Sequence, residues 1–141
     1  MNRIVHISET KTTVWSRAKG SPASPPDAVY IGRAMPRQRL AGSPFRNPWP
    51  LIDTNDDQER AAVVAKFGRW LFGDADLIAE KGPPPSLEEV RTLAGKPLVC
   101  WCVPKLCHGH ILAAVADGLI VDRDDLEQWI AGGMAQRPGG E

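Results

Sequence analysis

Residues 97–119 read Pro-Leu-Val-Cys-Trp-Cys-Val-Pro-Lys-Leu-Cys-His-Gly-His-Ile-Leu-Ala-Ala-Val-Ala-Asp-Gly-Leu, and two hydrophobic periods meet within them. The apolar run 97–103 is short, contains two β-branched residues and is followed by Pro104, which predicts a buried strand. Beyond this proline the apolar residues recur at helical spacing, and Gly118 supplies a C-terminal stop. The stretch therefore predicts a strand, a tight turn and a helix that begins near Cys107.

Strand and helix signals follow one another along the rest of the chain. Strands are predicted over residues 3–7, 12–15 and 27–33. Helices are predicted from Asn55 to Gly73, from a capping box of Ser86 and Glu89 to Gly95, and over residues 122–130. A length of 141 residues predicts one domain over residues 1–131, followed by a flexible C-terminal tail over residues 132–141.

Composition and charge are those of an ordinary soluble protein, with 43% hydrophobic and 24% charged residues. Seventeen basic residues balance seventeen acidic ones, so bulk charge gives no argument for nucleic acid or an anionic membrane as a partner. The sequence contains neither an apolar stretch of membrane-spanning length nor a signal-peptide pattern. We therefore expect a cytoplasmic protein, in which clustered cysteines are metal ligands or reactive thiols rather than disulfides.

Residues 100–110 contain all three cysteines and two of the three histidines of the chain. A strand places Cys100 and Cys102 on one of its faces. A helix that begins near Cys107 places Cys107 and His110 on one face of its first turn, with His108 pointing elsewhere. Soft and borderline ligands that converge in this way suit tetrahedral zinc, with the predicted ligands Cys100, Cys102, Cys107 and His110. The spacing differs from paired C-x2-C knuckles, and a nucleoside deaminase is excluded because no His-x-Glu is present.

Three other interpretations of the same cluster stay open. A cysteine at a helix N-terminus, near Lys105 and His108, is expected to have a lowered pKa, which would make Cys107 a thiolate at neutral pH. The same N-terminus is also suited to bind an anion or phosphate without cysteine chemistry. The structural alternative is that the cysteines are small buried hydrophobic residues and His108 caps or packs.

A positively charged segment precedes the first predicted helix. Residues 33–50 contain four arginines and no lysine or acidic residue. The glycine, prolines and aromatics of residues 42–50 indicate an ordered irregular loop that could present arginine side chains and a stacking ring to a phosphate or base. The alternative is a solvated loop whose Phe45 and Trp49 lie under the core.

Several motifs in a fixed order together resemble an uncharacterised family of phages and bacteria, catalogued as domain of unknown function 4326. The motifs are Val29-Tyr30-Ile31-Gly32-Arg33, Ser43-Pro44-Phe45, Asn47-Pro48-Trp49, Arg69-Trp70-Leu71, Leu93-Ala94-Gly95-Lys96-Pro97-Leu98, Cys100-Trp101-Cys102 with Pro104, and Cys107-His108-Gly109. The resemblance covers roughly residues 28–117. The chain departs from it at Trp49, where the family commonly has Phe, and at His110, where the family often has Asp. Asp and His can both bind a metal or accept a proton.

The resemblance implies that the arginine-rich loop and the cysteine turn belong to one small α/β domain. We expect a Rossmann-like three-layer architecture, or a two-layer sheet with flanking helices. In open α/β sheets the loops at the carboxyl ends of the strands share a crevice. Arg33, Asn47 and residues 107–110 are therefore expected to face one pocket.

The leading hypothesis is an enzyme that acts on a nucleotide, nucleoside or other phosphate-bearing small substrate. The candidate substrate-binding residues are Arg33, Ser43, Asn47 and Trp49, and the candidate catalytic residues are Cys107, His108 and His110, with or without zinc. The alternative is a binding or adaptor module with a structural zinc. A third hypothesis is nucleic-acid binding through the arginine-rich loop.

Overall fold

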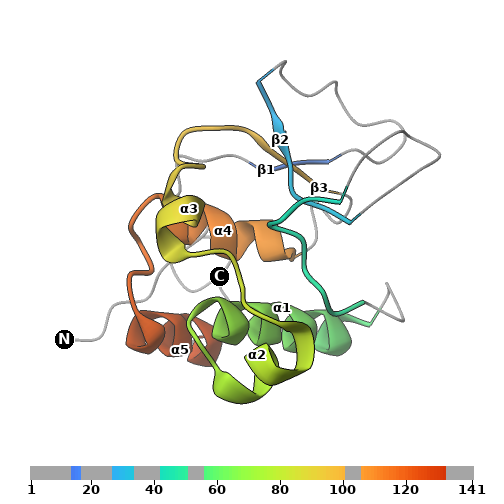
Figure 1. Ribbon diagram of the computed structural model, residues 1–141, viewed down its shortest axis with the longest axis vertical. Coiled ribbons are helices and arrows are strands. Elements are labelled where there is room, and N and C mark those ends of the chain that lie inside the picture. Colours follow the sequence, from blue (N-terminus) through green and yellow to red (C-terminus); the bar gives the residue numbers. More distant parts are fainter. Residues whose placement is uncertain (1–13, 17–26, 34–41, 51–55, 101–105, 133–141) are drawn as a thin grey trace.

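Three short parallel strands form the sheet of the computed structural model (Figure 1). They are β1 (Val14–Ser16), β2 (Val29–Tyr30) and β3 (Leu98–Cys100). β3 arises from the apolar run predicted as a buried strand, and it lies in the centre of the order β1-β3-β2. Leu98 pairs with Val14 on one side and with Val29 on the other. Because all three strands are parallel, their carboxyl ends lie at one edge of the sheet.

The structure describes residues 14–16, 27–33, 42–50, 56–100 and 106–132. The strand predicted over residues 3–7, the helix start predicted at Asn55 and residues 133–141 of the predicted tail lie outside these ranges.

Each of the five described helices begins with a side-chain cap, which satisfies backbone N–H groups of the first turn. The helices are α1 (Asp57–Leu71), α2 (Ala75–Lys81), α3 (Leu87–Arg91), α4 (His108–Ala116) and α5 (Arg123–Ala131). Their caps are Asp56, Asp74, Ser86, Cys107 and Asp122. None of these helices combines the length and the apolar character needed to cross a bilayer.

The described helices lie on one side of the three strands in Figure 1, with α4 between the sheet and the layer of α1, α2 and α5. All nine residues of α4 are buried, as expected for a helix that is apolar on every face. The predicted α/β class is confirmed to the extent that helices combine with a parallel sheet. The described part of the chain does not establish the Rossmann-like layering.

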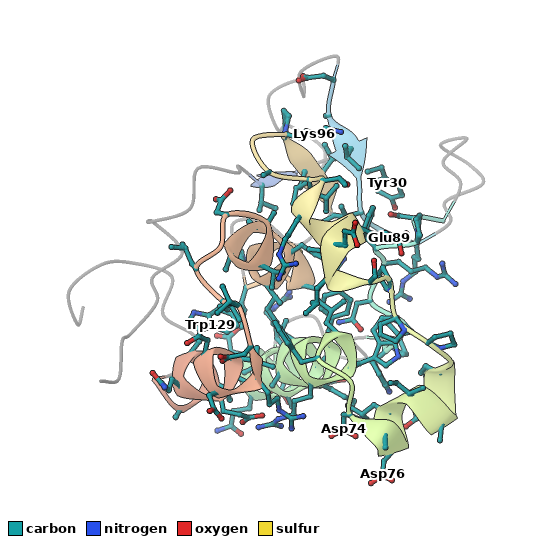
Figure 2. All side chains as sticks on the ribbon, turned by 60° about the vertical axis from the view of Figure 1, so that its left-hand side comes forward. Tyr30, Asp74, Asp76, Glu89, Lys96 and Trp129 are labelled. Carbon is teal, nitrogen blue, oxygen red and sulfur yellow. The ribbon has the colours of Figure 1, made fainter. Side chains whose placement is uncertain are left out.

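Gly68 lies where α1, α4 and α5 pack closely together. A Cβ at Gly68 would lie 2.8 Å from Cδ1 of Leu126 and 3.0 Å from Cδ1 of Ile111, so the three helices approach where α1 lacks a side chain. Trp129 of α5 is completely buried and lies on the side of α5 that faces the rest of the molecule (Figure 2). Asp74 and Asp76, at the start of α2, lie at the outer edge of the same view.

Helix boundaries follow the sequence prediction in some places and differ in others. The capping box of Ser86 and Glu89 is confirmed, with both reciprocal hydrogen bonds present. The first long helix is capped by Asp56, whose carboxylate accepts from two backbone N–H groups. α2 was not predicted from the sequence, because a helix of seven residues with no fully buried side chain leaves little apolar periodicity.

An ion cluster links α1, α2 and α5 at the surface. Arg69 donates to both carboxylate oxygens of Glu127 at 3.0 Å, and Arg123 donates to the same carboxylate at 2.7 Å. Arg123 also lies 3.8 Å from Asp74. The hydrogen bond from Arg69 is the main cause that lowers the pKa of Glu127 to about 2.

We expect this cluster to make the stability of the fold depend on pH in acid. Because the pKa of Glu127 is lower in the folded chain than the ordinary 4.5, its contribution is present above about pH 4.5 and is lost as the pH falls towards 2. Glu127 is 38% exposed, so we expect about 1 kcal/mol or less. Urea unfolding at a series of pH values from about 6 down to about 2, which spans the loss of this contribution, measures it. Equal pH slopes for the wild type and Glu127→Gln would contradict the assignment.

Candidate functional site

Cys107 caps the N-terminus of α4, so the helix starts where the sequence predicted. The residue has extended backbone angles, with φ −145° and ψ 154°, and its Sγ accepts a hydrogen bond from the N–H of Gly109 at 3.3 Å. An N-cap side chain normally offers an oxygen to the first turn of the helix, and here a sulfur takes that place. The thiol therefore lies at the positive end of the helix dipole.

The imidazole of His108 connects the Cys107 thiol to the sheet. Its Nε2 lies 2.8 Å from the carbonyl oxygen of Ile31, directly after β2, and its Nδ1 lies 3.7 Å from Sγ of Cys107. A carbonyl oxygen only accepts, so Nε2 carries a proton. In the neutral ring Nδ1 is then the acceptor, and it faces the thiol. The edge of Phe67 packs against this ring, with centroids 5.0 Å apart and planes at 75°.

His110 has a different task. Its Nδ1 accepts a hydrogen bond from the backbone N–H of Cys107 at 3.0 Å, which completes the capping box. The sequence analysis favoured His110 over His108 as the partner of the thiol. In the structure Nδ1 of His108 lies 3.7 Å from Sγ, and His110 bonds to the backbone of Cys107. Since Nδ1 of His110 is an acceptor, the proton of its neutral ring is on Nε2.

Gly109 allows the start of α4 to approach the sheet. A Cβ at this position would lie 2.7 Å from Cδ1 of Ile31 and 3.2 Å from Cγ1 of Val14. A larger residue at position 109 would require either the Ile31 side chain or the start of α4 to shift. The glycine between the two histidines thus brings His108 within reach of the Ile31 carbonyl.

The thiol and both imidazoles are buried among the described residues. Cys107 is 1% exposed, His108 8% and His110 7%. The site lies at the carboxyl-end edge of the sheet, where β2 ends and α4 begins. Residues 34–41 and 101–105, which follow β2 and β3 in the sequence, lie outside the described ranges.

Three of the four predicted substrate-binding residues are held in contacts within the protein. Ser43 is buried, and its Oγ accepts from the N–H of Phe45. Asn47 accepts from the N–H of Trp49 and donates to the carbonyl of Val63 in α1. These bonds shape the loop and fasten it to α1.

Trp49 is 6% exposed and packs edge-on against Trp70, with ring centroids 5.7 Å apart. Its Nε1 donates to Glu80 at 3.0 Å, and Nζ of Lys66 lies 5.6 Å from its ring centroid. This placement agrees with the alternative in which Trp49 lies under the core, and it does not support a stacking platform for a ligand.

Arg33 is exposed and lies two residues after Ile31, whose carbonyl contacts His108. Tyr30 is the last residue of β2 (Figure 2), and its hydroxyl donates to the carbonyl of Arg33 at 2.7 Å, which fixes the backbone at this corner. Of the predicted pocket residues, Arg33 and residues 107–110 are both at the carboxyl-end edge of the sheet. Asn47 instead contacts α1.

The predicted zinc ligands are described only in part. The side chain of Cys100 and all of Cys102 lie outside the described residues, whereas the side chain of Cys107 is described and buried. Within the described ranges no three His, Cys, Asp or Glu side chains are grouped as a metal site. A neutral His110 that ligates a metal through Nε2 would carry its proton on Nδ1, where it would meet the Cys107 N–H. Metal binding through Nε2 of His110 would therefore break the hydrogen bond from the Cys107 N–H to Nδ1.

The sequence analysis missed three contributors to this site. These are the carbonyl of Ile31, the ring of Phe67 and the guanidinium of Arg60, whose Nη1 donates to the carbonyl of Leu106 at 3.2 Å. Arg60 left a signal, because it precedes Val64 and Phe67 on the apolar stripe of α1 at helical spacing. A charged residue at a core position is unusual and points to a specific partner.

Comparison with known proteins places this arrangement in a family. A family model described as a domain of unknown function (DUF4326) matches residues 14–118. The match runs from β1 to the glycine after α4, so it includes all three strands and the turn from Cys107 to His110. No curated protein and no solved structure matches the chain.

Proposed function

Since this chain belongs to the DUF4326 family, whose description assigns no activity, we propose a function from the site itself. The protein is an enzyme that uses the Cys107 thiol as a nucleophile. Its substrate is a nucleotide, a nucleoside or another phosphate-bearing small molecule. It works in the cytoplasm, where thiols stay reduced.

The observation that carries the proposal is the chain of contacts from Cys107 through His108 to Ile31. A nucleophile, a base within hydrogen-bond reach and a third group that orients the base form the usual arrangement of covalent catalysis. Sγ and Nδ1 are 3.7 Å apart, and the carbonyl of Ile31 holds Nε2 at 2.8 Å. The proton shared by sulfur and Nδ1 can reside on the imidazole, which leaves a thiolate that the Gly109 N–H stabilises.

The reaction follows from that charge state. The thiolate of Cys107 attacks the electrophilic atom of the substrate, and the bond to the leaving group breaks. His108 gives the proton from Nδ1 to the leaving group and is neutral again. Proton transfer by a positioned side chain typically contributes about 10²–10⁴-fold to a rate.

The class of substrate follows from the edge at which the thiol lies. The N-terminus of α4 carries partial positive charge, and Arg33 supplies an exposed guanidinium two residues beyond Ile31. Both features favour a phosphate. A Rossmann-like connection, in which ligands bind at the carboxyl ends of parallel strands, is consistent with the order β1-β3-β2 and with a helix N-terminus after β3.

A structural zinc is the second candidate, and one observation favours it. Zinc bonds are about 2.3 Å to sulfur and about 2.0 Å to nitrogen, so a sulfur and a nitrogen that bind one tetrahedral zinc lie roughly 3.5 Å apart. This separation is near the 3.7 Å between Sγ of Cys107 and Nδ1 of His108. A metal-bound histidine commonly donates its other N–H to a carbonyl, as His108 does. The ligands would then be Cys107 and His108 with Cys100 and Cys102, and the protein would be a binding or adaptor module.

Alkylation of the native protein by iodoacetamide tests the main proposal. An enzyme that admits a substrate to Cys107 must also admit a reagent of this size. Trypsin cuts after Lys105, so the peptide 106–123 reports Cys107 separately from Cys100 and Cys102. We expect Cys107 to be alkylated at neutral pH while the protein stays folded, and we expect inorganic phosphate or a nucleoside monophosphate to slow the reaction.

Metal content by plasma mass spectrometry on the same sample decides between the two candidates. About one zinc per chain with an unreactive Cys107 would favour the structural site. An unreactive thiol without metal would refute both candidates and leave Cys107 as a buried helix cap. Cys107→Ser separates them further, because it should unfold a zinc module but leave a folded and inactive enzyme.

A further inference from the structure

The peptide group between Leu106 and Cys107 is held on both of its polar sides. Its carbonyl accepts from Nη1 of Arg60 at 3.2 Å, and its N–H donates to Nδ1 of His110 at 3.0 Å. Arg60 comes from α1 and His110 from α4, so two helices fix the plane from which the side chain of Cys107 departs. Both side chains are more than nine-tenths buried.

The position of Arg60 is unfavourable for the helix that carries it. Arg60 lies in the first turn of α1, where the helix dipole disfavours a positive charge, and it is only 6% exposed. A buried charge also loses its hydration. A charged side chain at such a place calls for a specific partner, and the carbonyl before Cys107 is one.

We propose that Arg60 is a positioning residue for the thiol of Cys107. Its hydrogen bond to the carbonyl of Leu106 orients the peptide from which the thiol projects. This inference rests on the proposed function, because the direction of the thiol matters only if Cys107 is a nucleophile. The hydrogen bond requires a donor at position 60, whereas packing alone would accept an apolar chain of similar length.

The rate at which iodoacetamide alkylates Cys107 in the folded protein tests the proposal, followed through the tryptic peptide 106–123. We expect Arg60→Met to slow the alkylation about tenfold, because the thiol loses the direction that the held peptide gives it. A merely structural role would act in the opposite direction, since looser packing uncovers Cys107 and speeds the alkylation. Arg60→Lys keeps a donor at position 60 and should restore most of the rate. Arg69→Met, on the same helix but paired with Glu127, is the matched control and should leave the rate unchanged.

Each outcome supports or overturns the inference. An unchanged or faster alkylation of Cys107 in a folded Arg60→Met protein overturns it and leaves Arg60 as a packing residue. Should Arg60→Met not fold, Arg60→Gln takes its place, and a wild-type rate in that variant, whose side chain is shorter, overturns the inference. Failure of the proposed function has a different signature, since Cys107 of the folded wild-type protein would then not be alkylated.

Discussion

Replacement of His108 by glutamine is expected to return Cys107 to the behaviour of an ordinary thiol. Glutamine can still donate to the Ile31 carbonyl, but it cannot hold a proton for the thiolate. The midpoint of thiol ionisation should move towards about 8.5, the value of a free cysteine. Turnover should fall about 10²–10⁴-fold once a substrate is in hand. An absorbance titration, which follows the ultraviolet thiolate absorbance against pH as a difference from the Cys107→Ser protein, and the rate of Cys107 alkylation measure the change.

His110→Gln is the comparison that makes this result specific. Glutamine is a natural third residue of a capping box, so it can accept from the Cys107 N–H as His110 does. The two substitutions have the same chemistry and lie two positions apart. A larger change in the midpoint from His110→Gln than from His108→Gln would contradict the assignment of His108 as the partner of the thiol.

Phe67→Ala is expected to produce the largest loss of stability among the variants discussed here. Phe67 is completely buried, and its removal costs transfer free energy and leaves a cavity, together about 3–5 kcal/mol. The cavity would lie against the imidazole of His108, whose ring centroid is 5.0 Å from that of Phe67. His108 would then lose part of the packing that orients it. Urea unfolding measures the loss of stability, and the absorbance titration reports on the orientation of the ring.

Phe72→Ala is the matched control, because Phe72 lies directly after the same helix and is only partly buried. We expect it to cost clearly less than Phe67→Ala and to leave the ionisation of Cys107 unchanged. Similar losses for the two phenylalanines would show that the interior around His108 closes over the missing ring.

Local patterns in the sequence were sufficient for the strand, the turn and the helix around Cys107. The change from a short apolar run to helical spacing predicted β3 and α4, and Gly118 ends α4 with a positive φ of 77°. A cysteine at an N-cap could also be inferred from that pattern. These features depend on residues that are neighbours in the sequence, so one sequence can reveal them.

The partner of the thiol could not be predicted, because it depends on a contact between distant parts of the chain. Helical spacing pairs Cys107 with His110, three residues later. The ring of His108 instead turns towards Ile31, which is 77 positions away in the sequence. Only the approach of β2 to the start of α4, across Gly109, makes that orientation favourable. Spacing within one helix contains no information about this contact.

The loop of residues 42–50 shows the same limit. Its composition allowed either a binding surface or a self-anchored loop, and the choice depends on whether Trp49 finds a buried place. Trp70 and Glu80 provide that place, one by an edge-on ring contact and the other by accepting the indole N–H. Both belong to helices that follow the loop in the sequence.

Because α4 is buried along its whole length, access to its first turn and opening of the protein interior are the same event. A ligand that reaches Cys107 binds only the fraction of molecules in which this end of α4 is uncovered. Its apparent dissociation constant then equals the intrinsic constant divided by that fraction. Substitutions that loosen the packing around α4 would therefore tighten apparent binding while they lower stability, so affinity and stability would change in opposite directions.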